Sequence, residues 1–309
     1  MSVENFEHTF EVTTPACLKV SNVRGSVDVR PGEDGVISVT AVKHKGSISN
    51  GKTMIIIEQQ DDGTVIAEAK YENSITSWFG LNKPCKVDFS IRVPKNCSVK
   101  ANCVSCDAVI QGLEGDIDVN NVSGDLRLSD LSGEFTYSNV SGAITAHNLS
   151  GPLNLNTVSG DVQIQESQIP TMIGKTVSGS LSVQTPLGEG PYEFKTVSGD
   201  LKLLPPEDQG CIVKIKSISG NIRTSMPVTA SEGHRSNKQI TILDGGPDVN
   251  VKSVSGNVRI GAKAEVVEKA DVEAKPIEPI KPAKSQLQIL EEIDGGELSV
   301  EDAIKQLNP

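Results

Sequence analysis

Two cysteines have a spacing that could support metal or redox chemistry. Cys103-Val104-Ser105-Cys106 is a CxxC motif, the spacing with which thiolates bind zinc or exchange disulfides. The motif falls in the register of a repeat, however, because Val104-Ser105-Cys106-Asp107 matches Val122-Ser123-Gly124-Asp125, and Cys97 lies nine residues before Cys106. No second CxxC and no nearby pair of histidines completes a tetrahedral site. We therefore interpret Cys97 and Cys106 as members of a glycine column and expect no metal or cofactor here.

A column of aspartates could bind calcium or cap corners. Asp116, Asp125, Asp161 and Asp200 each follow a glycine directly, and nine-residue periodicity with Asp is typical of calcium-binding β-rolls. That motif needs paired glycines and an Asp two places after a Gly, whereas here a single Gly is followed at once by the Asp. We predict that these aspartates cap corners. The four histidines are scattered, and no nucleophile or acid/base motif is present, so we predict no enzyme.

Composition excludes several partner classes. The 309 residues carry 29 Lys+Arg against 40 Asp+Glu, a formal net charge of -11, which is unfavourable for nucleic acid. Aromatic residues make up 3%, which argues against a deep aromatic-lined pocket and hence against a small-molecule substrate. The first eight residues have neither a basic nor an apolar region, so we expect no secretory signal and a cytoplasmic location.

The elements that position these residues come from an internal repeat. One unit recurs eleven times. It consists of a branched aliphatic residue, a second residue that is usually Ser, a Gly, any residue, and then an apolar-x-apolar alternation. From Gly115 to Gly160 the glycines fall every nine residues, and the residue two before Gly alternates between Leu and Val, so the period is 18. In one copy, Leu126 and Leu128 share a face and Arg127 takes the other, as in a strand with one buried side. The pattern predicts an all-β fold, a parallel β-solenoid or two-sheet rack of about 18-residue coils.

Two further predictions concern the stacking of the coils. After Gly160 the glycine spacing is 19, 20 and 21 to Gly220 and then 36 to Gly256, which we interpret as two turns of 18. We also predict that Val158, Val177 and Val197 form one buried ladder over the strand residues of the Leu126 type.

The chain divides into four regions by pattern. Residues 1–110 read as an irregular β half that caps the β-domain, and 111–261 as the regular solenoid. Residues 262–284, with three prolines spaced by three, read as a linker. Residues 285–309 read as a helical hairpin whose apolar stripes are Leu287, Leu290, Ile293, Val300, Ile304 and Leu307. Because neither helix is long enough to be stable alone, we expect the hairpin to bind its copy in a second chain or another protein.

One segment between strands is apolar where a turn is normally polar. It contains the only Trp, Trp78, beside Phe79, with Leu81 two residues on. Two interpretations remain open: a folded-back loop that closes the end of the core, or an exposed anchor for a partner or a membrane surface.

The Val-Ser-Gly-Asp-Leu-x-Leu repeats, from about residue 10 to 261, resemble the bacterial β-strand-repeat family known as the putative-adhesin or toast-rack family. The segment from Ile289 to Ala303 resembles the short bihelical, SHOCT-like module often fused to it. The resemblance implies no reaction and no catalytic residues. It implies an association with cell-envelope stress systems of the phage-shock type, beside small membrane proteins.

We therefore expect a non-enzymatic scaffold of the cell-envelope stress response, cytoplasmic and peripheral to the inner membrane. Its hairpin would mediate self-association or recruit a protein partner, including a membrane protein. The alternative is an exported or surface-associated adhesin.

Overall fold

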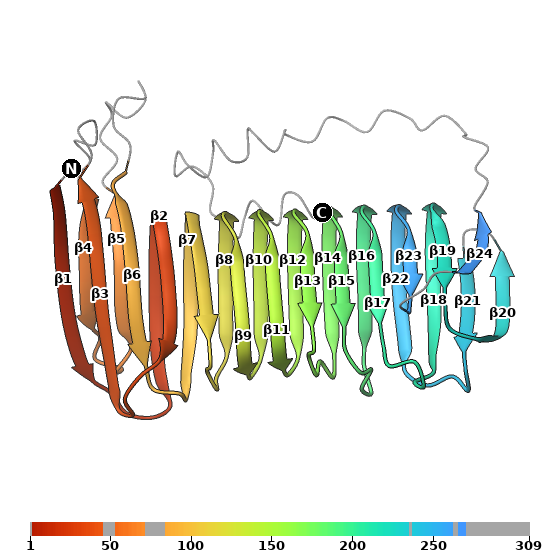
Figure 1. The fold of residues 1–309 in the computed structure, drawn as a ribbon, viewed down its shortest axis with the longest axis horizontal. Helices are drawn as coiled ribbons and strands as arrows, with labels where there is room; N and C mark the ends of the chain where they lie inside the picture. Colours follow the sequence, from red (N-terminus) through yellow and green to blue (C-terminus); the bar gives the residue numbers. More distant parts are fainter. Residues whose placement is uncertain (1, 46–52, 72–83, 235–236, 262–264, 270–309) are drawn as a thin grey trace, which may run out of the picture. The chain divides into compact units, whose positions relative to one another are not determined.

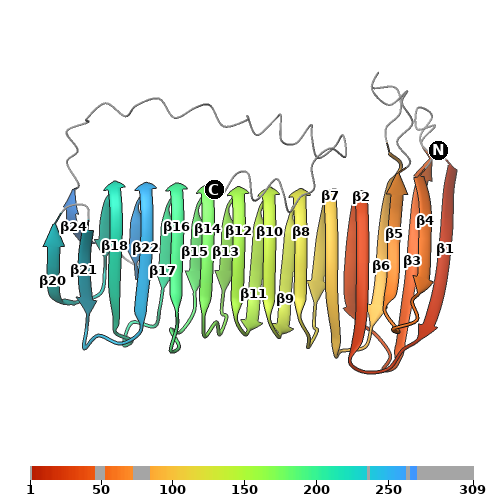
Figure 2. The same cartoon turned by 180° about the vertical axis from the view of Figure 1, so that it is seen from behind.

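The structure, a computed structural model, describes residues 2–45, 53–71, 84–234, 237–261 and 265–269. All regular structure in these ranges is β (Figures 1 and 2), as the repeat predicts. The chain divides into two compact units, Met1–Thr136 and Tyr137–Pro309. Within the segment expected to be linker, only Glu265–Lys269 is described, and it forms strand β24. The predicted hairpin over 285–309 lies outside the described residues.

The first unit contains two long strands that cross both of its layers. Its strands are β1 (Ser2–Glu11), β2 (Ala16–Pro31), β3 (Val36–Lys45), β4 (Thr53–Gln59), β5 (Val65–Tyr71), β6 (Lys86–Val93), β7 (Cys97–Gln111), β8 (Ile117–Ser123) and β9 (Leu126–Ser132). The first half of β2 pairs in parallel with β5 and the second half with β6, while β7 pairs with β2 along its length. Antiparallel partners complete the layers, because β4 pairs with β5, and β3 lies between β1 and β6.

The second unit is built from shorter, mostly parallel strands. They are β10 (Phe135–Ser141, which begins in the first unit), β11 (Ile144–Ser150), β12 (Leu153–Ser159), β13 (Val162–Gln165), β14 (Met172–Ser178), β15 (Leu181–Gln184), β16 (Tyr192–Ser198), β17 (Leu201–Leu204), β18 (Cys211–Ser219), β19 (Asn221–Thr224), β20 (Val228–His234), β21 (Asn237–Ile242), β22 (Asp248–Ser255), β23 (Val258–Ile260) and β24 (Glu265–Lys269). One layer runs β10-β12-β14-β16-β22-β18-β21-β20 and the other β11-β13-β15-β17-β23-β19-β24. The last strands of both layers, β20, β21 and β24, pair antiparallel.

A glycine turns the chain from one layer into the other. Gly160 has a φ of +132°, a conformation that side chains disfavour. A Cβ at this position would also lie 2.1 Å from the carbonyl oxygen of Gly142 in the preceding coil. The Ser-Gly corner therefore holds the coils at backbone contact, which explains why the repeat tolerates few other residues there.

The core follows the predicted alternation. Leu126 and Leu128 are buried while Arg127 is exposed. In the second unit the inward side chains of neighbouring strands stack in register, as Phe194 does with Val251. Burial of these apolar ladders between two layers supplies the main stabilising free energy of the fold.

The order of the coils differs from the prediction. The spacing of 36 residues between Gly220 and Gly256 is not two turns of 18, because it contains the hairpin of β20 and β21. The coil of β22 and β23 lies between the coil of β16 and β17 and the coil of β18 and β19. A parallel strand needs only a free edge in the right register, so the order along the chain does not fix the order in the sheet.

The predicted valine ladder is also wrong. Val158 is buried, but Val177 is only half-buried and Val197 is 48% exposed. The buried column lies one residue earlier and is polar: Asn139, Thr157, Thr176, Thr196, Ser217 and Ser253. These side chains face inward because they continue the alternation of their strands, as Thr196 does after the buried Phe194. Some of them also hydrogen-bond the corner, as when the Asn139 amide donates to the Gly142 carbonyl at 2.9 Å. The aliphatic residue that follows is half-buried or exposed on β14, β16, β22 and β18, whereas Val140 and Val158 are buried.

Candidate interaction surface

The CxxC cysteines lie inside the first unit. Both are buried free thiols with their Sγ atoms 3.2 Å apart. Cys106 is in register with Gly25, and its carbonyl oxygen lies 2.3 Å from where a Cβ on Gly124 would be, which confirms its place in the glycine column. The hydrogen bond to Cys103 and burial raise the pKa of the Cys106 thiol far above its usual value. The thiol is therefore protonated at neutral pH and a poor nucleophile.

The aspartates after the glycines cap corners, as predicted. Three of them accept a backbone N–H from the corner of a neighbouring coil. Asp116 Oδ1 accepts from Glu134 at 3.1 Å, Asp161 Oδ1 from Ser180 at 2.9 Å, and Asp200 Oδ1 from Asn257 at 2.8 Å. Their oxygens thus satisfy amides between coils. In the described ranges, no three His, Cys, Asp or Glu side chains gather as metal ligands would.

The site residues predicted from apolar patterns fall elsewhere in the chain. Trp78, Phe79 and Leu81, and the hairpin residues Leu287, Leu290, Ile293, Val300, Ile304 and Leu307, all lie outside the described residues. Their roles remain predictions.

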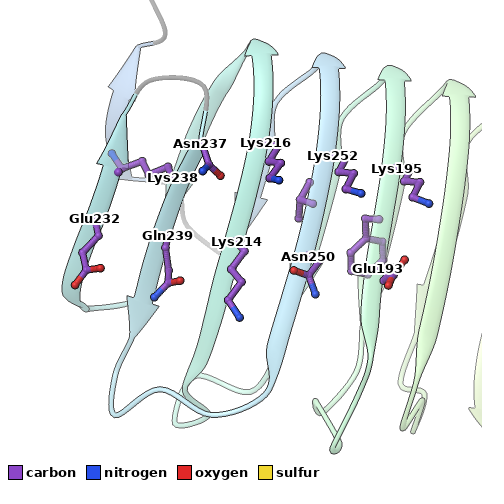
Figure 3. A pocket seen from close by; sticks show the side chains of 13 residues that line it. Glu193, Lys195, Lys214, Lys216, Glu232, Asn237, Lys238, Gln239, Asn250 and Lys252 are labelled. Atoms are coloured by element: carbon purple, nitrogen blue, oxygen red, sulfur yellow. The ribbon is translucent and has the colours of Figure 1, made fainter.

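The outward face of the second unit carries a row of lysines. Lys175, Lys195, Lys252 and Lys216 occupy the same register position on β14, β16, β22 and β18, and they are called here the lysine row. Figure 3 shows three of them in line across neighbouring strands. Since hydrogen-bonded strands lie about 4.8 Å apart, the row places positive charges side by side over about 14 Å.

The charges of the lysine row are not balanced by carboxylates. Among the described residues, none of its four ammonium groups forms an ion pair, whereas nearby Lys214 pairs with Asp248 at 2.8 Å. Glu193 and Glu232 line the same shallow hollow of about 620 Å³ but form no ion pair with the row. Like charges directly opposite each other on a sheet destabilise it.

An exposed apolar row runs beside the lysines. Val177, Val197, Val254 and Ile218, called here the corner row, each follow a member of the lysine row by two positions, so they share its face and lie nearer the corner. Val197, Val254 and Ile218 are 48%, 43% and 64% exposed. The face thus ends in apolar side chains at its edge with positive charges directly behind them.

The two rows change character together along the sheet. On β10 and β12 the lysine positions hold Ser138 and Asn156, and the corner positions hold Val140 and Val158, both buried. Basic residues thus occur where the aliphatic side chains are uncovered.

A second basic row flanks the same corners on the other layer. Lys202, Arg259 and Arg223 are in register on β17, β23 and β19, three residues after the corner glycine. The Nε atoms of both arginines are buried without a hydrogen-bond partner among the described residues. Asp200 directly follows the corner glycine Gly199. It accepts from the backbone N–H of Asn257 at 2.8 Å and so caps the corner.

The sequence contained the signal for the lysine row, which the repeat analysis missed. The four last copies read Lys175-Thr176-Val177-Ser178-Gly179, then Lys-Thr-Val-Ser-Gly, Lys-Ser-Ile-Ser-Gly and Lys-Ser-Val-Ser-Gly. Comparing the copies column by column, instead of seeking only their common residues, would have found the lysine four places before the glycine.

Comparison with known proteins identifies the architecture. The family described as Toastrack DUF4097 is matched over residues 18–261. No curated protein matches the chain. In the part of the chain that the structure describes, no helix is both long and apolar enough to cross a bilayer.

Several solved structures resemble the fold. A "putative adhesin" from Bacteroides fragilis NCTC 9343 is 10% identical, with a TM-score of 0.48, over 83% of this chain and 97% of that one. A "putative adhesin" from Parabacteroides distasonis ATCC 8503 is 11% identical, with a TM-score of 0.43, over 83% and 97%. A "putative lipid binding protein" from the same organism is 14% identical, with a TM-score of 0.43, over 83% and 96%.

Proposed function

The chain belongs to the Toastrack DUF4097 family, and from this membership we propose that it is a non-enzymatic scaffold that presents rows of side chains to a binding partner. The lysine row carries the proposal. Repeated coils place the same side chain at one-strand intervals, so weak contacts add up along a rigid surface. An uncompensated row of like charges costs stability, which favours a role in binding.

We assign partner recruitment to the C-terminal segment as well. Residues 285–309 carry apolar positions at helical spacing, including Leu290 and Ile304, and a segment of this length gains stability by association. We propose that this segment recruits a protein partner, including a membrane protein, or mediates self-association. We also propose that the scaffold acts in the cell-envelope stress response, in the cytoplasm and peripheral to the inner membrane. An exported or surface-associated adhesin is the alternative.

The experiment is a comparison of the full chain with a truncation ending at residue 284. Light scattering measures self-association, and a pull-down from cell extract measures partner capture. We expect the truncation to lose one or both while its β units melt at an unchanged temperature. If both forms behave alike in both assays, the C-terminal segment has no recruiting role. Cell fractionation separates the cytoplasmic scaffold from the exported adhesin.

A further inference from the structure

We propose that the corner edge of the second unit, formed by the lysine row and the corner row, binds the surface of a bilayer containing anionic lipid. The inference rests on the proposed function, since it names a partner for the same surface. It is carried by the order of two kinds of side chain along the strands, which the following features establish.

The order of the rows matches the order of layers in a bilayer. Along each strand the lysine comes first and the aliphatic residue two positions later, about 7 Å nearer the corner. A bilayer presents phosphate groups outside and an apolar layer beneath them. Val197, Val254 and Ile218 can enter that layer while the lysines behind them reach the phosphates, because long lysine side chains place the ammonium away from their apolar stems.

The electrostatics of the edge favour an anionic surface. Four lysines lie on one side of the corner and Lys202, Arg259 and Arg223 on the other. Two of the nearby acids are engaged, because Asp248 pairs with Lys214 and Asp200 caps a corner. Glu232 on β20 lines the hollow beside the lysine row. Glu193 lies one row further from the corner than the lysines, beside Asn250. The edge is therefore basic, although the whole chain is acidic.

Two other occupants fit the same edge less well. A second copy of the chain that docked by the same edge would bring lysine row against lysine row, which is repulsive. A soluble polyanion would neutralise the lysines but leave Val197, Val254 and Ile218 in water. A lipid surface offers negative charge and an apolar layer together, in the order that the two rows require.

The experiment is vesicle co-sedimentation of the full chain. One set of vesicles contains about one third phosphatidylglycerol in phosphatidylcholine, and the other is pure phosphatidylcholine. The test variants are the double variant Lys195→Gln with Lys252→Gln, and the double variant Val197→Ser with Val254→Ser. The matched control replaces two exposed lysines of the first unit, Lys19→Gln with Lys70→Gln, and removes the same charge.

We expect binding to anionic vesicles only, with affinity falling as salt rises. Each lysine at an anionic surface strengthens binding about five-fold, so the lysine double variant should bind about 25-fold more weakly. The serine double variant should also bind several-fold more weakly, and the control should bind like the wild type. All changed positions are exposed, so urea unfolding should confirm that every variant is folded.

Four outcomes would overturn the inference. Equal binding to neutral vesicles, or an unaltered affinity of the lysine double variant, shows that the row is not the contact. Tight binding to soluble polyphosphate that the serine variant retains in full identifies a polyanion site instead. If vesicles are not bound while pull-down still captures a partner through the lysine row, the lipid inference fails and the scaffold stands.

Discussion

The outward charges of the two units are arranged in opposite ways. In the first unit, Asp88 on β6 receives the Ser26 hydroxyl at 2.8 Å and contacts His44 at 2.9 Å and Lys86 at 3.0 Å. In the second unit the lysine row repeats one charge on four neighbouring strands without a carboxylate partner among the described residues. The first arrangement stabilises its own sheet, while the second costs stability. Outward side chains therefore stabilise the sheet in one unit, and in the other they form the binding surface that we propose.

If inward positions alone determine the fold, a charge placed in the core should cause the largest loss of stability, and a charge placed on the outward face should cause almost none. Phe194 is buried and its neighbour Lys195 is exposed. Phe194→Asp should lower the free energy of unfolding by about 4 kcal/mol or more, since an unpaired charge enters the core. Lys195→Asp should change it little. Urea unfolding measures both, and similar losses would show that the two faces are not independent.

Replacing a corner glycine should lower the free energy of unfolding wherever two coils touch. Gly160→Ala should cost about 2 to 3 kcal/mol, because the backbone is strained and the new Cβ meets the carbonyl of Gly142. Gly63 in the first unit has a φ of +83° with no atom within 4 Å of the added Cβ, so Gly63→Ala should cost about 1 kcal/mol. Thermal unfolding of the two variants separates strain from contact. Equal costs would contradict the tight packing of coils at the corner.

The polar cluster around Asp88 in the first unit should make a pH-dependent contribution to the free energy of unfolding. Burial raises the pKa of Asp88, but hydrogen bonds from Ser26, Lys86 and His44 outweigh it and hold that pKa below its usual value. The stabilisation is therefore present above the unfolded-state pKa of about 3.9 and is lost as the pH falls through the folded-state pKa. Asp88→Asn should cost about 0.5 kcal/mol at pH 7, an exposed-site value.

The measurement is urea unfolding of wild type and Asp88→Asn between pH 7 and pH 2. The two curves should differ at neutral pH and converge in acid. A difference that persists at pH 2 would mean that packing, and not charge, accounts for the effect.

The smallest expected effect is a gain in stability. Lys252 lies between Lys195 and Lys216, so Lys252→Gln should stabilise the protein by about 0.3 kcal/mol at low salt. The gain should vanish at high salt, where the repulsion is screened. A loss of stability in both conditions would show that Lys252 supports the fold, and the contrast between the two units would then be weaker.

Much of the architecture could be predicted from the sequence because it rests on periodicity. The alternation around Arg127 located the strands, and the nine-residue spacing placed Cys106 among the glycines. The aspartates were correctly predicted as caps, because a carboxylate beside a corner glycine finds a backbone amide of the next coil.

Other features could not be predicted for physical reasons. Near the corner, Thr196 and Val197 are both acceptable to a strand, and the Val-Ser-Gly motif drew attention to the valine, although the alternation from Tyr192 through Phe194 turns the threonine inward. The position of β22 depends on which sheet edge is free, which no local pattern encodes. The lysines recur at a fixed distance from the corner glycine, but their order along the row, with Lys252 between Lys195 and Lys216, follows only from the position of β22.

The insertion of β22 and β23 constrains how the chain can fold during synthesis. From β11 to β17 the strands pair with partners 18 to 20 residues away, whereas Asn257 bonds Asp200 across 57 residues. When β18 and β19 leave the ribosome, the neighbours on which they will rest do not yet exist. The growing stack must stop after β17 until β22 and β23 emerge to bridge it, and the last coils then close together. Duplicating one repeat can lengthen the early stack, but not this end, where two coils depend on each other.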